Sequence, residues 1–261
     1  MRSARIGIVN IMPKLEAYEP LLLGPLARTR VPVEPVLIRL ETHRYQSSDQ
    51  SHLDRHYVTF DAAIAAGPLD GLVITGAPVE ELPFSEVHYW PELVRILTYA
   101  RANIRTTLGL CWGGLALAAM LDIPKQRYPT KLFGVYTHHR LLDDHPLLDG
   151  QAEDFPCAHS RYAGIADWEL QGAESDGRLR LLARSPEAGY TLFETPDHRF
   201  VAHLGHPEYV ADRLVFEFER DRALARTDVP APVNFDPARP ATTWESHRET
   251  LFDRWVALAS A

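Results

Sequence analysis

The feature that most constrains this chain is a cysteine between glycines, at the point where a strand-like pattern meets a helical pattern. A short apolar run over residues 107–110 leads to Cys111, and an alanine- and leucine-rich helical pattern follows over residues 115–121. Gly109 and Gly113 allow a tight backbone path and leave the side chain at its apex uncrowded. The segment therefore predicts a buried strand, a sharp turn and the start of a helix, with Cys111 at the turn.

A thiol at this turn lies at the positive N-terminal end of a helix, which lowers the thiol pKa and favours the reactive thiolate. Cys111 is accordingly the candidate nucleophile. The competing interpretation is a buried structural cysteine, which is the commoner fate of a free cysteine. The flanking glycines favour the nucleophile but do not decide the question alone.

Length and composition narrow the class of protein. The 261 residues can bury a large core, and 46% apolar and 24% charged residues are ordinary values, so we expect one domain over residues 1–261. A formal charge of −8 leaves no cationic excess for nucleic acid or an anionic membrane. Cys111 and Cys157 form no disulfide framework, and neither a signal sequence nor a membrane-length apolar run is apparent. We therefore expect a cytoplasmic protein.

The first half of the chain alternates strand and helix patterns. Strand-like apolar runs occupy residues 6–11, 36–40, 69–75 and 107–110. Helical spacing occupies residues 15–28, where Pro20 and Pro25 are expected to break the helix, and residues 90–102. The polar residues 41–58 predict an irregular surface excursion that could form part of a substrate wall.

This alternation indicates an α/β fold with a mostly parallel sheet and helices on both faces. In such sheets the chemistry gathers beyond the C-terminal ends of the strands. The segment Thr75-Gly-Ala-Pro78 and Cys111 each follow a strand, so one shared site is expected there.

The second half of the chain is less regular over residues 123–163. Strand-like pieces follow at residues 179–183, 190–194 and 200–204. A helix is expected from there to about residue 224, then a proline-containing extended arm over residues 228–241 and a closing helix over residues 244–259.

His206 and Glu208 extend the candidate catalytic set. They are two residues apart at an expected strand end, where side chains i and i+2 point to the same face. A histidine oriented by a carboxylate beside a thiol can serve covalent acyl transfer. The alternative is a surface histidine with a coincidental neighbour. A metal site would recruit His203 as well, but residues 203 and 206 face opposite ways on a strand, so we expect no metal.

Seven segments then stand in a specific order along the chain: Ile8-Val-Asn-Ile-Met-Pro-Lys14, Val73-Ile-Thr-Gly-Ala-Pro78, Tyr89-Trp90, Cys111-Trp112-Gly113, Lys131-Leu-Phe-Gly-Val135, His159-Ser-Arg-Tyr162 and Gly205-His-Pro-Glu-Tyr209. In these segments the chain resembles homoserine O-acyltransferases of the homoserine transsuccinylase type, from about residue 5 to its C-terminal region. The resemblance implies a class I glutamine amidotransferase-like, flavodoxin-like three-layer sandwich and a homodimer. It also implies a place in methionine biosynthesis, with acyl-CoA as co-substrate and no other cofactor.

The resemblance also implies roles for single residues. Cys111 would take the acyl group as a thioester, with His206 as general base and Glu208 as its partner. Backbone N–H groups of Trp112 and Ala77 would bind the oxyanion. Three further positions would bind substrate: Lys131, Ser160 and Arg220, the last through a bidentate pair with an amino-acid carboxylate. Without the resemblance, these three would be interpreted as surface charges and a turn residue.

Glu80 bears on the acyl donor. The resemblance implies that relatives using succinyl-CoA have Gly at this position and those using acetyl-CoA have Glu. A carboxylate in the acyl pocket fills space and repels the distal carboxylate of a succinyl group, by roughly 4 kcal/mol at ~4 Å and an effective dielectric of about 20. If Glu80 pointed to solvent, screening would remove most of that repulsion. Acetyl-CoA is therefore the favoured donor and succinyl-CoA the alternative.

Two departures concern the acceptor. The family usually carries an extension before its first strand, and it usually has Gln where this chain has Leu115. Serine or another hydroxy amino acid therefore stays an alternative to homoserine. From other classes, a glutamine amidotransferase-type hydrolase could use the same cysteine and histidine, and a non-enzymatic binding protein could keep the fold.

Overall fold

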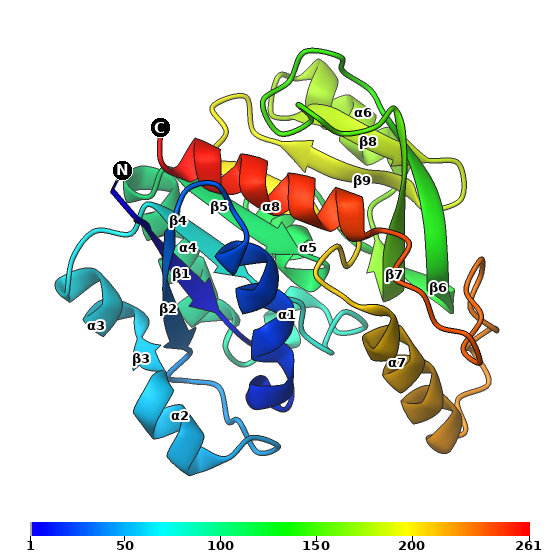
Figure 1. Ribbon diagram of the computed structural model, residues 1–261, viewed down its shortest axis with the longest axis horizontal. Coiled ribbons are helices and arrows are strands. Elements are labelled where there is room, and N and C mark those ends of the chain that lie inside the picture. Colours follow the sequence, from blue (N-terminus) through cyan, green and yellow to red (C-terminus); the bar gives the residue numbers. More distant parts are fainter. Residues whose placement is uncertain (1) are drawn as a thin grey trace.

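The computed structural model describes residues 2–261, which form one mixed sheet covered by helices on both faces (Figure 1). The strands are β1 (Ala4–Val9), β2 (Val33–Arg39), β3 (Val58–Thr59), β4 (Gly71–Ile74), β5 (Thr106–Leu110), β6 (Gln126–Arg140), β7 (Asp154–Gly164), β8 (Arg180–Ser185), β9 (Gly189–Glu194) and β10 (Phe200–His203). The helices are α1 (Leu15–Ala27), α2 (Gln50–His56), α3 (Phe60–Ala65), α4 (Trp90–Asn103), α5 (Trp112–Ala119), α6 (Asp167–Ser175), α7 (Ala211–Ala223) and α8 (Glu245–Ala259). The expected α/β class is confirmed.

The strand register brings three chain turns to one edge of the sheet. The order is β3-β2-β1-β4-β5-β10-β9-β8-β6-β7, parallel as far as β10 and antiparallel beyond it. Ile74 pairs with Gly109, and Leu110 pairs with His203. Because neighbouring parallel strands end at the same edge, the turns after β4, β5 and β10 lie side by side.

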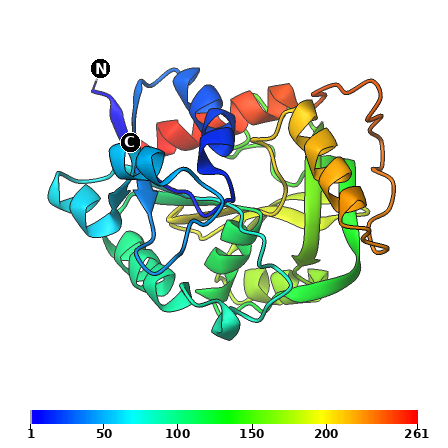
Figure 2. The same cartoon turned by 90° about the horizontal axis from the view of Figure 1, so that it is seen from below.

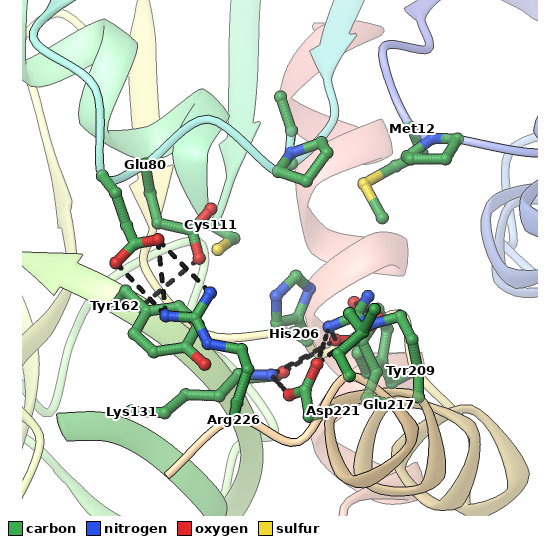
Figure 3. A pocket seen from close by; sticks show the side chains of 18 residues that line it. Met12, Glu80, Cys111, Lys131, Tyr162, His206, Tyr209, Glu217, Asp221 and Arg226 are labelled. Carbon is green, nitrogen blue, oxygen red and sulfur yellow. Dashed lines mark hydrogen bonds and ion pairs between the residues drawn. The ribbon is translucent and has the colours of Figure 1, made fainter. Parts of the chain in front are cut away.

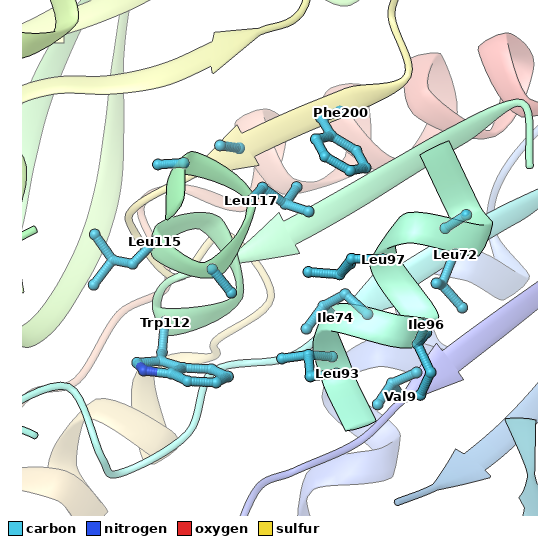
Figure 4. Packing of buried hydrophobic residues seen from close by; sticks show 14 of the residues in the cluster. Val9, Leu72, Ile74, Leu93, Ile96, Leu97, Trp112, Leu115, Leu117 and Phe200 are labelled. Carbon is cyan, nitrogen blue, oxygen red and sulfur yellow. The ribbon is translucent and has the colours of Figure 1, made fainter. Parts of the chain in front are cut away.

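Helices cover both faces of the sheet (Figure 2), and an apolar core lies beneath each layer of helices. One core joins the sheet to α3, α4, α5 and α6, and the other joins it to α1, α7 and α8. In the first core, Leu93 and Leu97 of α4 pack over Ile74 of β4 (Figure 4). Burying each such side chain contributes about 1.5–3 kcal/mol. Packing in these two cores fixes the position of the sheet edge at which the three turns lie.

The antiparallel half differs from the sequence expectation. Residues 123–163 were expected to be less regular, but β6 and β7 form a long hairpin with Phe133 opposite Ser160 and Val135 opposite Ala158. The hairpin carries polar side chains that are fully buried, among them Lys131 and Arg161. These polar residues interrupt the apolar alternation by which a strand is identified, and the structure stabilises them through partners that are distant in sequence.

Two expectations about the N-terminal half are wrong. Helix α1 continues through Pro20 and Pro25, because its apolar side, with Tyr18 and Leu22, packs in the core and offsets the lost hydrogen bonds. Residues 41–58 are not irregular throughout, since they contain α2 and β3. Their buried Tyr45, Leu53 and Tyr57 cluster on Leu15, and none of these residues lines the cavity at Cys111.

The segment before α8 runs beside β6 as an arm. The Val233 N–H donates to Phe133 O at 3.0 Å, and Val135 N–H donates to Val233 O at 2.8 Å. Gly134 has φ +132°, and a Cβ there would lie 2.3 Å from the Val233 nitrogen. A glycine is therefore required where the arm crosses the strand.

Candidate active site

Cys111 occupies a strained turn between β5 and α5. Its φ of 50° and ψ of −110° are unusual for a residue with a side chain, and its N–H donates to His203 O at 2.8 Å. A Cβ at Gly109 would lie 2.5 Å from Gly113 O, and a Cβ at Gly113 would lie 2.3 Å from Ile74 O. The two glycines are therefore what allows this turn to form, as the sequence predicted.

The turn opens into a cavity of about 330 Å³ (Figure 3). Its walls come from the turns after β4, β5 and β10, from β6 and β7, and from α7 and the segment that follows it. The lining residues are Met12, Pro13, Gly76, Ala77, Pro78, Glu80, Glu81, Cys111, Lys131, Ser160, Tyr162, His206, Tyr209, Glu217, Arg220, Asp221, Leu224 and Arg226.

His206 and Glu208 lie in the loop after β10 and not on the strand itself. The loop brings them together: His206 Nδ1 lies 2.7 Å from Glu208 Oε1, and Tyr18 donates its hydroxyl to the same oxygen. Both side chains are buried, and the ring of His206 stacks on Tyr209 at 4.0 Å. Glu208 thus fixes the orientation of the imidazole and leaves Nε2 for Cys111.

The charges around His206 favour its protonated form beside Cys111. Burial opposes the protonated imidazole, but the charges of Cys111 and Glu208 and the hydrogen bonds to both outweigh it and raise the pKa of His206 from 6.5 to about 10. The imidazole therefore carries its proton at neutral pH, next to the Cys111 sulfur. A protonated imidazole beside a cysteine favours the thiolate, which is the nucleophilic form.

The Gly76–Ala77 turn lies directly beside the nucleophile. A Cβ at Gly76 would lie 3.6 Å from the Cβ of Cys111 and 3.5 Å from Cε1 of His206. Trp112 is the first residue of α5, where a helix leaves its N–H groups without intrahelical acceptors. The Gly76–Ala77 turn and the start of α5 thus both adjoin Cys111, which is the placement that an oxyanion hole requires.

A charged wall faces Cys111 across the cavity. Lys131 donates to Asp221 Oδ2 at 2.5 Å, and Ser160 donates to Glu217 Oε2 at 2.9 Å. Arg220 donates to Glu217 at 3.0 Å and to Asp221 at 2.7 Å. Lys131 and Ser160 are buried, and the Arg220 side chain is 37% exposed. The structure therefore brings all three expected substrate-binding residues to this cavity.

The wall offers both signs of charge. Although burial opposes ionisation, Lys131, Arg220 and Arg213 lower the pKa of Glu217 to about 2. Glu217 is therefore anionic at any physiological pH. An amino acid at this wall would meet cations for its carboxylate and anions for its ammonium group.

Glu80 lines the cavity and does not point to open solvent. Its carboxylate accepts the Tyr162 N–H at 3.3 Å, and its main-chain oxygen accepts a hydrogen bond from Lys125. Burial raises the pKa of Glu80, against the opposing effects of backbone hydrogen bonds and Lys131. The Glu80 carboxyl therefore loses its charge at a higher pH than a fully solvated carboxyl would.

Three residues of the site were not predicted from the sequence: Glu217, Asp221 and Tyr18. The two acids recur with Arg213 and Arg220 at helical spacing along α7, so a charged stripe on that helix was an available signal. Tyr18 lies 190 residues from Glu208 and carries no local signal. Leu115, expected to alter the acceptor site, lies in the apolar core and not among the residues that line the cavity.

His203, the further residue of the metal-ligand set that the sequence argued against, does not join His206 and Glu208, because its ring contacts Gly205 and His247. Among residues 2–261, ligand-type atoms lie within 4.8 Å of one another in two other groups. One is Cys157, His203 and His247, and the other is His145, Glu194 and His198.

Comparison with known proteins identifies close sequence relatives. A family model described as homoserine O-succinyltransferase matches residues 1–260. A homoserine O-succinyltransferase from Aeromonas hydrophila is 39% identical over 262 residues, which span 98% of this chain and 81% of that protein. A homoserine O-acetyltransferase from Bacillus cereus is 38% identical over 261 residues, which span 98% of this chain and 85% of that protein.

Solved structures with similar folds include two glutamine amidotransferases. One from Thermotoga maritima has a TM-score of 0.61 at 12% identity, covering 99% of this chain and 97% of that one. One from Methylobacillus flagellatus has a TM-score of 0.56 at 15% identity, covering 99% of this chain and 95% of that one. At these identities the likeness shows the fold alone, and it confirms the expected class I glutamine amidotransferase-like architecture.

Proposed function

This chain belongs to the homoserine O-succinyltransferase family, and we propose that it acylates homoserine through a thioester on Cys111, with acetyl-CoA as the preferred donor. Homoserine O-acyltransfer is the activity of the family, while relatives of nearly equal identity bear the names of acetyl- and succinyltransferases. The observation that carries the proposal is the strained Cys111 turn beside the His206–Glu208 pair in one cavity.

In the first half-reaction the Cys111 thiolate attacks the carbonyl carbon of acyl-CoA. The tetrahedral intermediate collapses by breaking the bond from that carbon to the CoA sulfur. His206 gives its proton to the departing CoA thiolate, so that free CoA and an acylated Cys111 remain beside a neutral imidazole. The raised pKa of His206 supports this assignment, because the proton needed by the leaving group is already on the imidazole.

In the second half-reaction the neutral His206 takes the proton from the homoserine hydroxyl. The oxygen attacks the thioester carbon, and the carbon–sulfur bond to Cys111 breaks. The products are the homoserine ester, the Cys111 thiolate and the protonated imidazole, which is the starting state. The N–H groups of Trp112 and Ala77 would hold the oxyanion in both halves, and each such donor is typically worth about 10²–10³ in kcat.

The charged wall fits the acceptor. We assign the homoserine carboxylate to Arg220 and Lys131, and the ammonium group to the anionic Glu217 and Asp221. Ser160 already donates to Glu217, so it holds that carboxylate in place. Serine has the same zwitterion on a shorter side chain, and the distance from this wall to Cys111 would select against it.

Glu80 supports acetyl-CoA as donor, because it occupies the cavity next to Cys111 and fills space that a longer acyl chain needs. When ionised, Glu80 also repels a succinyl carboxylate. The homodimer implied by the resemblance and the cytoplasmic location expected from the sequence stay predictions. None of the helices in residues 2–261 is long and apolar enough to cross a membrane.

The proposal is tested by intact-protein mass spectrometry after brief exposure to acetyl-CoA or succinyl-CoA without acceptor. We expect an acetyl adduct on the wild type that disappears when homoserine is added. Cys111→Ser should form no thioester adduct. Cys157→Ser is the matched control, because it removes the second cysteine of the chain and should still be acylated.

Each other outcome is informative. A succinyl adduct that forms as fast as the acetyl adduct would contradict the donor preference but keep the mechanism. An acetyl adduct that serine removes faster than homoserine would contradict the acceptor assignment. If neither donor gave an adduct, glutaminase activity would become the assay, and the thioester route would be wrong.

A further inference from the structure

A buried chain of hydrogen bonds lies behind the loop that carries His206. The Gly205 N–H donates to His203 Nδ1 at 3.0 Å, His203 Nε2 lies 3.0 Å from His247 Nε2, and His247 Nδ1 lies 2.9 Å from Gln151 Oε1. The four residues come from the loop after β10, from β10 itself, from α8 and from the loop before β7. His203 and His247 are 0% and 2% exposed, so these contacts are shielded from water.

The Gly205 N–H, at one end of this hydrogen-bonded chain, determines which ring nitrogens carry protons. A backbone N–H can only donate, so His203 Nδ1 is an acceptor, and the proton of the neutral ring resides on Nε2. That proton points to His247 Nε2, which must accept it, and His247 therefore carries its own proton on Nδ1. The Gln151 oxygen accepts this last proton. Every donor then has one acceptor along the whole chain.

Both rings remain neutral in the pH range where enzymes work. Burial is the main cause that holds the pKa of His203 well below its usual range, and the neighbouring His247 adds to it. Burial likewise lowers the pKa of His247 to about 3. The tautomers are thus fixed by partners and do not alternate with a charged state.

The Gly205 end of the hydrogen-bonded chain lies directly beside the catalytic histidine. Gly205 directly precedes His206, whose own N–H donates to Ala158 O at 2.8 Å. A Cβ at Gly205 would lie 2.9 Å from His159 Nε2 and 3.0 Å from Ala158 O, so the backbone packs against β7 with no room to shift. On the opposite side the Gly205 N–H has the His203 ring as its acceptor. The peptide that sets the direction of His206 is therefore held from two sides.

We propose that His203, oriented by His247 and Gln151, is a positioning residue that fixes the Gly205–His206 backbone and thereby the direction of the His206 imidazole. The inference rests on the catalytic role proposed above for His206. It assigns to helix α8, which carries His247 and lies outside the cavity, a contribution to catalysis through two hydrogen bonds. Misplacing a reacting group by a fraction of an ångström lowers kcat without weakening substrate binding.

A transition metal is the competing occupant of this cluster. Cys157 Sγ lies 4.0 Å from His203 Nε2, and the three side chains could surround a soft cation. Coordination would need the Nε2 lone pair of His203, but the Gly205 N–H forces a proton onto that nitrogen. It would also need a thiolate, and burial raises the pKa of the Cys157 thiol. The hydrogen-bonded chain therefore explains the cluster better than a metal does.

Two substitutions of His203 distinguish the roles of its two ring nitrogens. His203→Asn places an amide oxygen near the position of Nδ1, so it still accepts the Gly205 N–H but does not reach His247. His203→Gln reaches the position of Nε2, so it keeps a hydrogen bond to His247 but leaves the Gly205 N–H without its acceptor. Loss of one such bond changes a rate or an equilibrium by ~10-fold.

We expect kcat of the Gln variant to be about tenfold below that of the Asn variant, with KM for both substrates nearly unchanged. The melting temperature should show the opposite order or no difference, because the Gln variant keeps the link to α8. If kcat followed the melting temperature, or if both variants had equal kcat, His203 would be a structural residue and the proposal would be wrong.

Nitrogen-15 NMR of the histidine rings provides a readout that does not depend on activity. We expect a neutral ring protonated on Nε2 for His203 and one protonated on Nδ1 for His247, unchanged between pH 8 and about 5. The signals are assigned by their loss in His203→Asn and His247→Asn. Protonation of His203 on Nδ1 would overturn the proposal. So would tight one-to-one Co²⁺ binding with a thiolate charge-transfer band that Cys157→Ser abolishes.

The two proposals fail in different ways. If the wild type formed no acyl-enzyme, the thioester mechanism would fall while the tautomers of His203 and His247 could still be as described. If the acyl-enzyme formed but the Asn and Gln variants reacted equally fast, the mechanism would stand and the positioning role would fall.

Discussion

At the scale of single residues, Glu80 shows how burial changes what a charge can do. The residue lies in the cavity beside Cys111, and burial raises the pKa of its carboxyl. Below that pKa Glu80 is neutral and acts on the acyl group by its volume alone. Above it, the carboxylate also repels a succinyl carboxylate. Donor selectivity should therefore depend on pH.

We predict that the ratio of kcat/KM for succinyl-CoA to that for acetyl-CoA falls in the wild type as pH rises through the raised pKa of Glu80. In Glu80→Gln, which keeps the volume without the charge, the ratio should be higher and independent of pH. Glu80→Gly removes both obstacles and should raise the ratio further, by about tenfold or more over the wild type. Steady-state rates with each donor at a series of pH values measure these ratios.

Equal ratios for the Gln and wild-type enzymes at every pH would show that Glu80 acts by volume only. A ratio that Glu80→Gly does not change would place the donor preference elsewhere in the cavity. In both cases the thioester mechanism would be unaffected, since Glu80 takes no part in it.

At the scale of elements, the turn between β5 and α5 depends on glycines because backbone atoms approach too closely for a Cβ. Gly113 faces Ile74 O of the neighbouring strand, where an added Cβ would lie at 2.3 Å. Backbone atoms cannot move aside as the end of a flexible side chain can. The close packing of β4 against the start of α5 therefore holds the nucleophile in place, at the cost of a strained conformation at Cys111.

We predict that Gly113→Ala loses several kcal/mol of folding free energy together with most acyl-enzyme formation. Gly172→Ala is the matched control, because Gly172 lies inside α6 with nothing within 4 Å of its added Cβ. That control should gain about 0.5–1 kcal/mol, since alanine is the better helix former. Denaturant unfolding measures both, and comparable stability of the two variants would contradict the packing argument.

At the scale of the whole molecule, the C-terminal helix completes the core on one face of the sheet. Trp255 of α8 is fully buried and packs over Gly71 of β4, where an added Cβ would lie 3.0 Å from its ring. The same core holds Ile8 of β1 and Phe133 of β6, so both halves of the sheet contribute to it. We therefore propose that residues 1–261 fold as one cooperative domain.

We predict a single calorimetric transition in which the calorimetric and van't Hoff enthalpies agree. Trp255→Ala should lower the temperature of that transition without splitting it, because it removes about 3–5 kcal/mol of packing. Trp168→Ala, which truncates a tryptophan that is 69% exposed, should leave it nearly unchanged. Two separate transitions, of which Trp255→Ala shifted only one, would show that the chain has two domains.

The sequence by itself determined the features that depend on neighbouring residues. The glycines around Cys111 specify a turn through local φ and ψ, and apolar runs specify the strands of the parallel half. His206 and Glu208 are two residues apart, so a short loop suffices to pair them. The resemblance to a family added Lys131, Ser160 and Arg220, which residue patterns alone would have placed at the surface.

Only the tertiary structure decided which distant groups meet. Sheet register and helix packing bring the Tyr18 hydroxyl to Glu208, Lys131 to Asp221, and His247 to His203. Each polar group is stable in the interior because the other supplies its hydrogen bond or opposite charge. Such partners are separated by tens to hundreds of residues, so no local sequence pattern predicts them. The polar contacts of the β6–β7 hairpin and the hydrogen-bonded chain behind His206 are therefore visible only in the folded molecule.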